Sequence, residues 1–192
     1  MNKLAYLALL GAAALSAQTI ALDLDPAQSD VEFTVGSTLH TVHGSFHLKR
    51  GAIRFDADTG KAEGELVVDA TSGASGTAAR DRRMHKKVLQ SDRYPEIVFR
   101  PDRVEGKVAA EGPSQVRLHG IFSIHGSDHE MTVPVDVQSA AGEYTVTAHF
   151  VVPYIQWGMK NPSSFVLRVS DKVEITVHTT ARIAKQTALN RN

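Results

Sequence analysis

The stretch "QVRLHGIFSIHGSDHEMTVPVDVQ", residues 115–138, contains two runs of alternating apolar and polar residues with a polar turn between them. A period of two is typical of a β-strand with one buried face and one solvated face. The "HGSDHE" segment between the runs carries the residues that favour a turn. The stretch therefore predicts an antiparallel hairpin whose apolar face comprises Val116, Leu118, Phe122, Ile124, Val133, Val135 and Val137.

The same alternation recurs along the chain, and nothing resembles the strand–helix–strand order of a parallel sheet. The further alternating segments are "VEFTV" (31–35), "TVHGSFHLKR" (41–50), "AIRFDAD" (52–58), "GELVVDA" (64–70), "EIVFRPD" (96–102), "EYTVTAHFVVPY" (143–154) and "DKVEITVHTTARI" (171–183). A sheet this large closes or folds over to remove its edges. We therefore expect one all-β domain of antiparallel strands, either a sandwich or an extended barrel of about eight strands. Such a barrel would have room for one slim ligand.

The inward face of this barrel is predicted to consist mainly of Val, Ile, Leu and Phe, so its interior should be dry. If it is hollow, it suits an apolar and elongated ligand; a filled core is the alternative, and the pattern alone does not decide. The candidate tunnel residues are Phe33, Val35, Phe46, Leu48, Ile53, Phe55, Leu66, Val68, Ile97, Phe99, Leu118, Phe122, Val133, Val135, Tyr144, Val146, Phe150 and Trp157. Trp157 lies between strands, where it is expected to plug one end or contact the ligand.

The N-terminus predicts export. Residues 1–17 have Lys3, an apolar run from Leu4 to Leu15 and then small residues, the order of a secretory signal peptide. The run is shorter than the roughly 20 residues that span a bilayer. Cleavage is expected after Ser16 or Ala17, with Ala21 less favoured. We therefore expect a periplasmic protein.

Composition excludes several function classes. The chain contains no cysteine, which removes thiol catalysis, redox pairs and cysteine metal sites. Its 21 basic and 21 acidic residues balance, which argues against a nucleic-acid partner because such binding needs a broad cationic field. The nine histidines are scattered and no nucleophile motif is present, so we predict no metal, no cofactor and no enzymatic activity.

One polar segment interrupts the strands: "AARDRRMHKKVLQSDRYPEI", residues 78–97. Between Arg80 and Arg93 it holds six Lys or Arg against two Asp. A short helix is predicted near residues 78–91, preceded by a flexible hinge at "SGASG" (72–76). In that helix Arg80, Arg83 and Lys87 fall along one side, where they could bind a phosphate head group. Contact with an anionic membrane surface and a solvated face without function are the alternatives.

Four segments, in this order, resemble the YceI-like family of lipid-binding or polyisoprenoid-binding proteins. They are "SDVEFTVGSTLHTVHGSF" (29–46), "ARDRRMHKKVLQSDRYPEIVF" (79–99), "LHGIFSIHGSDHEMTVPV" (118–135) and "WGMKNPSSFVLRVSDKVEITV" (157–177). The family pattern Arg-Asp-x-His-Leu falls on residues 80–84, with Arg83 at the His position and Met84 at the Leu position. The resemblance places the domain at residues 22–184 and leaves 185–192 as a flexible tail.

The resemblance implies a lipocalin-like barrel in the bacterial cell envelope that holds a polyisoprenoid without chemistry on it. Expected ligands are a polyprenyl phosphate or an isoprenoid quinone, and the expected role is that of a carrier, buffer or chaperone, as a monomer or homodimer. Two alternatives stay open. One is an envelope enzyme acting on a lipophilic or amide substrate, and the other is a structural stress protein with a filled barrel.

Overall fold

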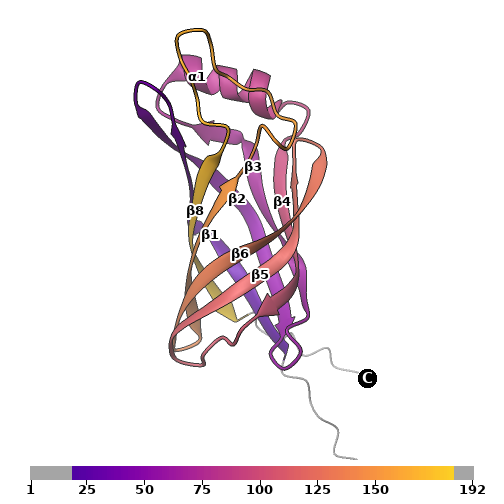
Figure 1. Cartoon of the computed structure of the whole chain (residues 1–192). Coiled ribbons are helices and arrows are strands. Elements are labelled where there is room, and N and C mark those ends of the chain that lie inside the picture. The colour runs from indigo at the N-terminus through magenta and orange to yellow at the C-terminus, as the bar shows by residue number, and fades with distance from the viewer. Residues whose placement is uncertain (1–18, 184–192) are drawn as a thin grey trace, which may run out of the picture.

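The computed structural model describes residues 19–183, and eight strands account for most of them (Figure 1). The predicted signal peptide and the predicted tail from residue 185 lie outside the described residues. The strands are β1 (Thr19–Gly36), β2 (Thr41–Asp56), β3 (Ala62–Ala74), β4 (Glu96–Glu105), β5 (Gly112–Ile124), β6 (Ser127–Ala140), β7 (Glu143–Val152) and β8 (Val173–Ile183). Between β3 and β4 lie the helix α1 (Ala78–Arg83) and the π-helix η1 (Met84–Leu89).

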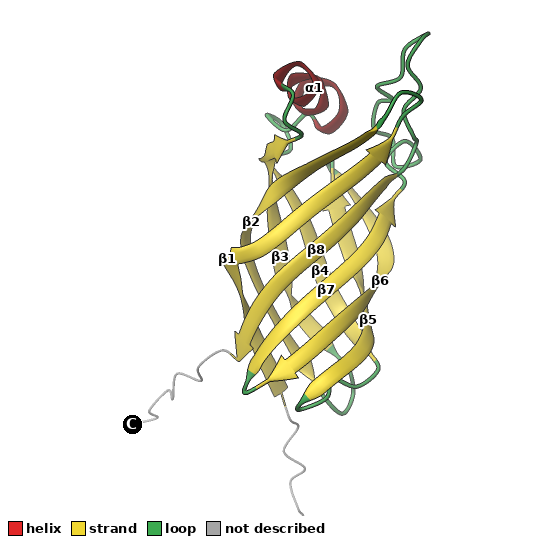
Figure 2. Cartoon of the chain, turned by 90° about the vertical axis from the view of Figure 1, so that its left-hand side faces the viewer, coloured by secondary structure: helices red, strands yellow, loops and turns green. Residues whose placement is uncertain are grey.

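The eight strands form one closed antiparallel barrel in sequence order. Each strand pairs with the next, and β8 pairs with β1, for example Val177 opposite Val31, so that no sheet edge is left open. Figure 2 shows the strands inclined steeply across the barrel, as closure requires. The predicted fold class, a single antiparallel barrel with one short helical insert, is confirmed.

The two ends of the barrel differ. At the end where the chain enters β1 and leaves β8, the strands are joined by shorter connections between β2 and β3, β4 and β5, and β6 and β7 (Figure 1). The opposite end, called the mouth from here on, carries α1 and η1, the β1–β2 loop (37–40), the β5–β6 turn and the β7–β8 loop (153–172). The mouth therefore holds most of the residues that lie between strands.

Aromatic side chains on one strand pack over glycines of the neighbouring strand, so that the barrel wall can curve tightly there. A Cβ on Gly44 would collide with the Phe33 ring and with the carbonyl of Ala74. Phe33 and Phe46 in turn pack together with their ring centroids 5.4 Å apart. Glycine at this position of β2 is thus set by the ring beside it.

Candidate functional site

The barrel encloses a cavity of about 650 Å³ that runs from the mouth deep into the interior. This volume lies within the range of small-molecule sites, about 300–1,000 Å³. All of the candidate tunnel residues except Phe55, Tyr144 and Trp157 line it. The period-two pattern therefore placed nearly every inward side chain on the correct face. The barrel is hollow over part of its length, in contrast to the alternative of a filled core.

Phe55 and Tyr144 face inward but lie beyond the cavity. Both are buried at 6% exposure and pack into the core at the end that holds the chain termini. With Ala62, Val104 and Val116 they belong to the buried core outside the cavity lining, and we call these five residues the floor. The prediction that Phe55 and Tyr144 line the tunnel wall is corrected accordingly.

Trp157 lies in the β7–β8 loop at the mouth, outside the cavity wall. Its indole stacks on the His129 ring with centroids 4.0 Å apart and planes inclined by 6°, and it contacts Phe122 at 5.7 Å. Burial lowers the pKa of His129, which favours the neutral ring in this stack. Trp157 therefore does not line the cavity itself but packs at the mouth against Phe122, which does.

The polar residues of the cavity lining are concentrated at the mouth. They are Ser37, His40, Ser75, Thr77, Arg80 and Arg83. Deeper in the barrel the lining is apolar except for Thr179, whose hydroxyl already shares a hydrogen bond of 2.6 Å with Ser29. The site thus has a long apolar interior and one polar, cationic opening.

The insert between β3 and β4 covers part of this opening. Met84, Val88 and Leu89 line the cavity and pack against the core, while Arg82, Lys86 and Lys87 are exposed. The apolar stripe of the insert therefore faces the interior and these three cations face outward, an amphipathic arrangement that fixes the insert over the barrel.

The insert is fixed at its start by Asp81 and Arg80. The Asp81 carboxylate accepts hydrogen bonds from the backbone N–H of Ser75, at 3.0 Å, and from its hydroxyl. Arg80 donates from Nε to Ser75 Oγ at 2.6 Å and from Nη2 to the Ser75 carbonyl at 2.7 Å. Because β3 continues to Ala74 and these bonds follow at once, the prediction of a flexible hinge at residues 72–76 is wrong.

His85 fixes the other part of the insert. Its Nε2 lies 2.8 Å from the Gly73 carbonyl, which can only accept, so Nε2 carries the proton. In the neutral ring Nδ1 then accepts from the hydroxyl of Ser91, a residue only 2% exposed, at 2.9 Å. Sequence reasoning gave His85 no role, since a lone histidine in a basic segment carries no signal of its own.

The three candidate head-group residues do not share one pocket. Arg80 lines the cavity, with two of its nitrogens already bonded to the turn before α1. Lys87 lies in a separate surface pocket of about 480 Å³ between the insert and the β7–β8 loop. Arg83 lines both the cavity and this surface pocket.

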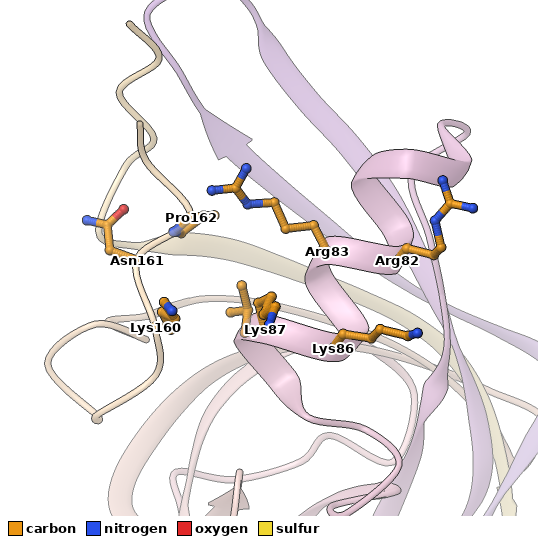
Figure 3. Close-up of a pocket in the computed structure, with 8 residues that line it drawn as sticks. Arg82, Arg83, Lys86, Lys87, Lys160, Asn161 and Pro162 are labelled. Atoms are coloured by element: carbon orange, nitrogen blue, oxygen red, sulfur yellow. The ribbon is translucent and has the colours of Figure 1, made fainter. Parts of the chain in front are cut away.

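Figure 3 shows the surface pocket, which we call the cationic pocket: Arg82, Arg83, Lys86, Lys87, Val88, Lys160, Asn161 and Pro162. Arg83 reaches toward the loop that carries Lys160, whereas Arg82 and Lys86 point away from it (Figure 3). Within residues 19–183 no ion pair involves any of these cations. The clustered cations make the local potential positive, which favours anionic groups in general.

The β7–β8 loop contributes residues that the sequence pattern did not reveal. Tyr154 donates a hydrogen bond from its hydroxyl to the Ser170 carbonyl at 2.7 Å, and burial raises its pKa to about 12, so it stays protonated. Tyr154 and Met159 are buried and line the cavity beside Pro162. A non-alternating stretch gives no period from which their inward direction could be read.

The described part of the chain holds no group of three or more His, Asp or Glu arranged to bind a metal ion. His43, His47 and His149 are exposed on the barrel. No helix within residues 19–183 is long and apolar enough to cross a membrane.

A closed eight-stranded antiparallel barrel with an apolar cavity places the chain in the class of small hollow β-barrel proteins. The YceI-like domain family matches residues 22–181, and the chain belongs to this family. The resemblance seen in the sequence is thereby confirmed. Among curated proteins, none matches the chain.

Solved structures share the fold at low sequence identity. Burkholderia cenocepacia BcnA superposes with a TM-score of 0.69 at 19% identity, covering 82% of this chain and 99% of BcnA. A polyisoprenoid binding domain from Saccharophagus degradans, described as implicated in plant cell wall breakdown, gives 0.69 at 16% identity, covering 86% and 99%. The Campylobacter jejuni YceI protein gives 0.61 at 16% identity, covering 75% and 86%.

Proposed function

We propose that this protein binds an elongated apolar lipid, a polyisoprenoid, in the barrel cavity and serves as a carrier or buffer for it. The observation that carries the proposal is the separation of polarity along the cavity. The interior is lined by aliphatic and aromatic side chains, and the polar groups are at the mouth. An amphiphile with a long apolar tail and a polar head has the same distribution.

The dimensions of the barrel favour an elongated guest. β5 has 13 residues and, at about 3.3 Å per residue and a tilt of about 40°, spans roughly 33 Å along the barrel axis. Water gains little in such a cavity, because a buried water needs two to four polar partners. Burial of each CH₂ of a guest contributes about 0.8 kcal/mol, so a long chain can bind without a reactive group.

The mouth supports a phosphorylated or otherwise polar head group. Arg83 lies between the cavity and the cationic pocket, where Lys87 and Lys160 are its neighbours. A guanidinium binds two phosphate oxygens at once, and both amines add charge. We assign the head group to Arg83 and Lys87, with Arg80 holding the turn from which the insert starts.

A hydrolytic alternative receives little support from the hydroxyl groups of the mouth. Ser75 Oγ is engaged with Asp81 and Arg80, and Ser37 Oγ donates to the His40 carbonyl at 2.7 Å. Neither hydroxyl has a histidine base as its partner, which nucleophilic activation would need. The proposal therefore involves binding alone, in the periplasm to which residues 1–17 would direct the chain.

Mass spectrometry of an organic extract of natively purified protein tests the proposal. A prenyl lipid in stoichiometric amount is the expected result. Titration of lipid-free protein with polyprenols provides the second arm, followed through the single tryptophan, Trp157, which touches the cavity-lining ring of Phe122. Protein that is purified empty and gives no saturable response to any polyprenol would overturn the proposal.

A further inference from the structure

The β7–β8 loop at the mouth exposes large apolar side chains. Phe165 is fully exposed, at 101%, and Val166 is exposed to 79%. They occupy the tip of a tight turn closed by hydrogen bonds from Ser164 N to Leu167 O, at 2.8 Å, and from Leu167 N to Ser164 Oγ, at 3.1 Å. Turn tips ordinarily carry Gly, Asn, Asp, Ser or Pro, so an aromatic and a β-branched residue here are unusual.

A third exposed apolar residue belongs to the same unit. Leu39, exposed to 72%, lies in the β1–β2 loop, and this loop is hydrogen-bonded to the β7–β8 loop. The Thr38 N–H donates to the Arg168 carbonyl at 3.0 Å, and the Ser170 N–H donates to the Gly36 carbonyl at 2.8 Å. The two apolar tips are therefore held together on one side of the mouth, as Figure 2 shows for the loops themselves.

The cations at this end differ from those on the barrel wall. On the wall, Arg50 pairs with Glu65 at 3.0 Å and Arg117 pairs with Glu105. At the mouth, Arg82 and Lys86 project from the exposed face of the insert and take part in no ion pair within residues 19–183 (Figure 3). One end of the molecule thus combines exposed apolar tips with uncompensated positive charge.

We propose that the mouth docks on a bilayer containing anionic phospholipid. Phe165, Val166 and Leu39 enter the boundary between head groups and acyl chains, and Arg82 and Lys86 lie against the lipid phosphates. An interface of this kind requires buried apolar area together with cations in the head-group layer, and the mouth supplies both. Docking there places the opening of the cavity against the membrane, yet it does not require the cavity to be occupied.

Co-sedimentation of the mature chain with vesicles tests the proposal. Vesicles of equal parts phosphatidylglycerol and phosphatidylcholine should bind the protein, and vesicles of phosphatidylcholine alone should bind it far less. The double substitution R82E/K86E should weaken partitioning at least about thirtyfold, because each cation near the surface contributes about a factor of five. F165S/V166S should weaken it at least about tenfold.

Matched controls lie at the opposite end of the barrel. Ile183 is an exposed apolar residue there, at 51%, and Arg54 and Lys61 are exposed cations outside any ion pair of the described residues. I183S and R54E/K61E should partition like the unsubstituted chain. If the mouth and control variants behave alike, or if anionic vesicles do not retain the chain, the docking proposal is refuted.

The polyprenol titration separates this proposal from the proposed function. All of the substituted side chains are exposed, so each variant should keep the unfolding midpoint of the unsubstituted chain. F165S/V166S, which changes no residue of the cavity or of the cationic pocket, should also keep the Trp157 response to polyprenol. Loss of vesicle binding with an unchanged polyprenol response supports docking as a separate property. Vesicle binding by a chain that binds no polyprenol would refute the proposed function and leave docking supported, whereas capture of a protein partner without vesicle binding would refute docking.

Discussion

Ala148 offers a direct test of whether a guest lies inside the barrel. It is in β7, lines the cavity and is paired with Val135 on one side and Val177 on the other. Ala148→Phe would project a phenyl ring into the cavity, where its six carbons would displace about as many carbons of the guest. At about 0.8 kcal/mol per CH₂ the loss reaches about 5 kcal/mol as an upper limit, or more than three orders of magnitude in Kd.

The assay is a fluorescence titration with geranylgeraniol, read from Trp157, alongside the unfolding midpoint in urea. Thr145→Phe is the control, because Thr145 is exposed on the outer face of the same strand. We expect Ala148→Phe to weaken binding at least a hundredfold while the control binds like the unsubstituted chain. Equal affinities of two folded variants would refute the assignment of the guest to the barrel interior.

Three further predictions concern the head group, the insert and the barrel surface. Arg83→Glu with Lys87→Glu should weaken binding of a prenyl diphosphate at least about tenfold more than that of the prenyl alcohol of equal length; equal losses in the two titrations would contradict the head-group assignment. Asp81→Ala should lower the free energy of unfolding by about 2 kcal/mol in urea melts because it removes two hydrogen bonds, whereas the exposed Asp92→Ala should change it little. The pKa of His119 is raised, first by its hydrogen bond to Asp102 and also by its hydrogen bond to Glu130. The stabilising contribution of the protonated ring is therefore complete below about pH 6.5 and is lost as pH rises through the raised pKa. The loss in free energy of unfolding caused by His119→Gln should thus be smaller at about pH 9 than at about pH 6. A loss that is independent of pH would contradict this prediction.

The barrel and its inward face could be predicted from the sequence because a period of two reports directly on which side of a strand a residue lies. Position along the barrel axis is a different quantity. Phe55 and Phe33 have the same pattern, yet Phe33 lines the cavity and Phe55 belongs to the floor. Only closure of all eight strands determines the height along the barrel at which each ring lies.

The cationic site was harder to predict because of the helix geometry. The α-helical spacing placed Arg80, Arg83 and Lys87 on one side, but from Met84 onward the insert is a π-helix, whose hydrogen bonds span five residues instead of four. Arg80 is moreover turned inward by its bonds to Ser75. The tip residues of the β7–β8 loop carry no periodic signal, and their exposure follows only from the three-dimensional course of that loop.

The buried floor with Phe55 and Tyr144 lies beyond the inner end of the cavity, so we expect any guest to enter and leave through the mouth. A chain-like molecule would have to enter tail first and leave head first through the same opening. Transfer by threading from one side of the protein to the other is then not expected, and donor and acceptor would each meet the same face in turn. Such a protein would work as a shuttle that turns between two encounters, with the last group to enter always the first to be handed over.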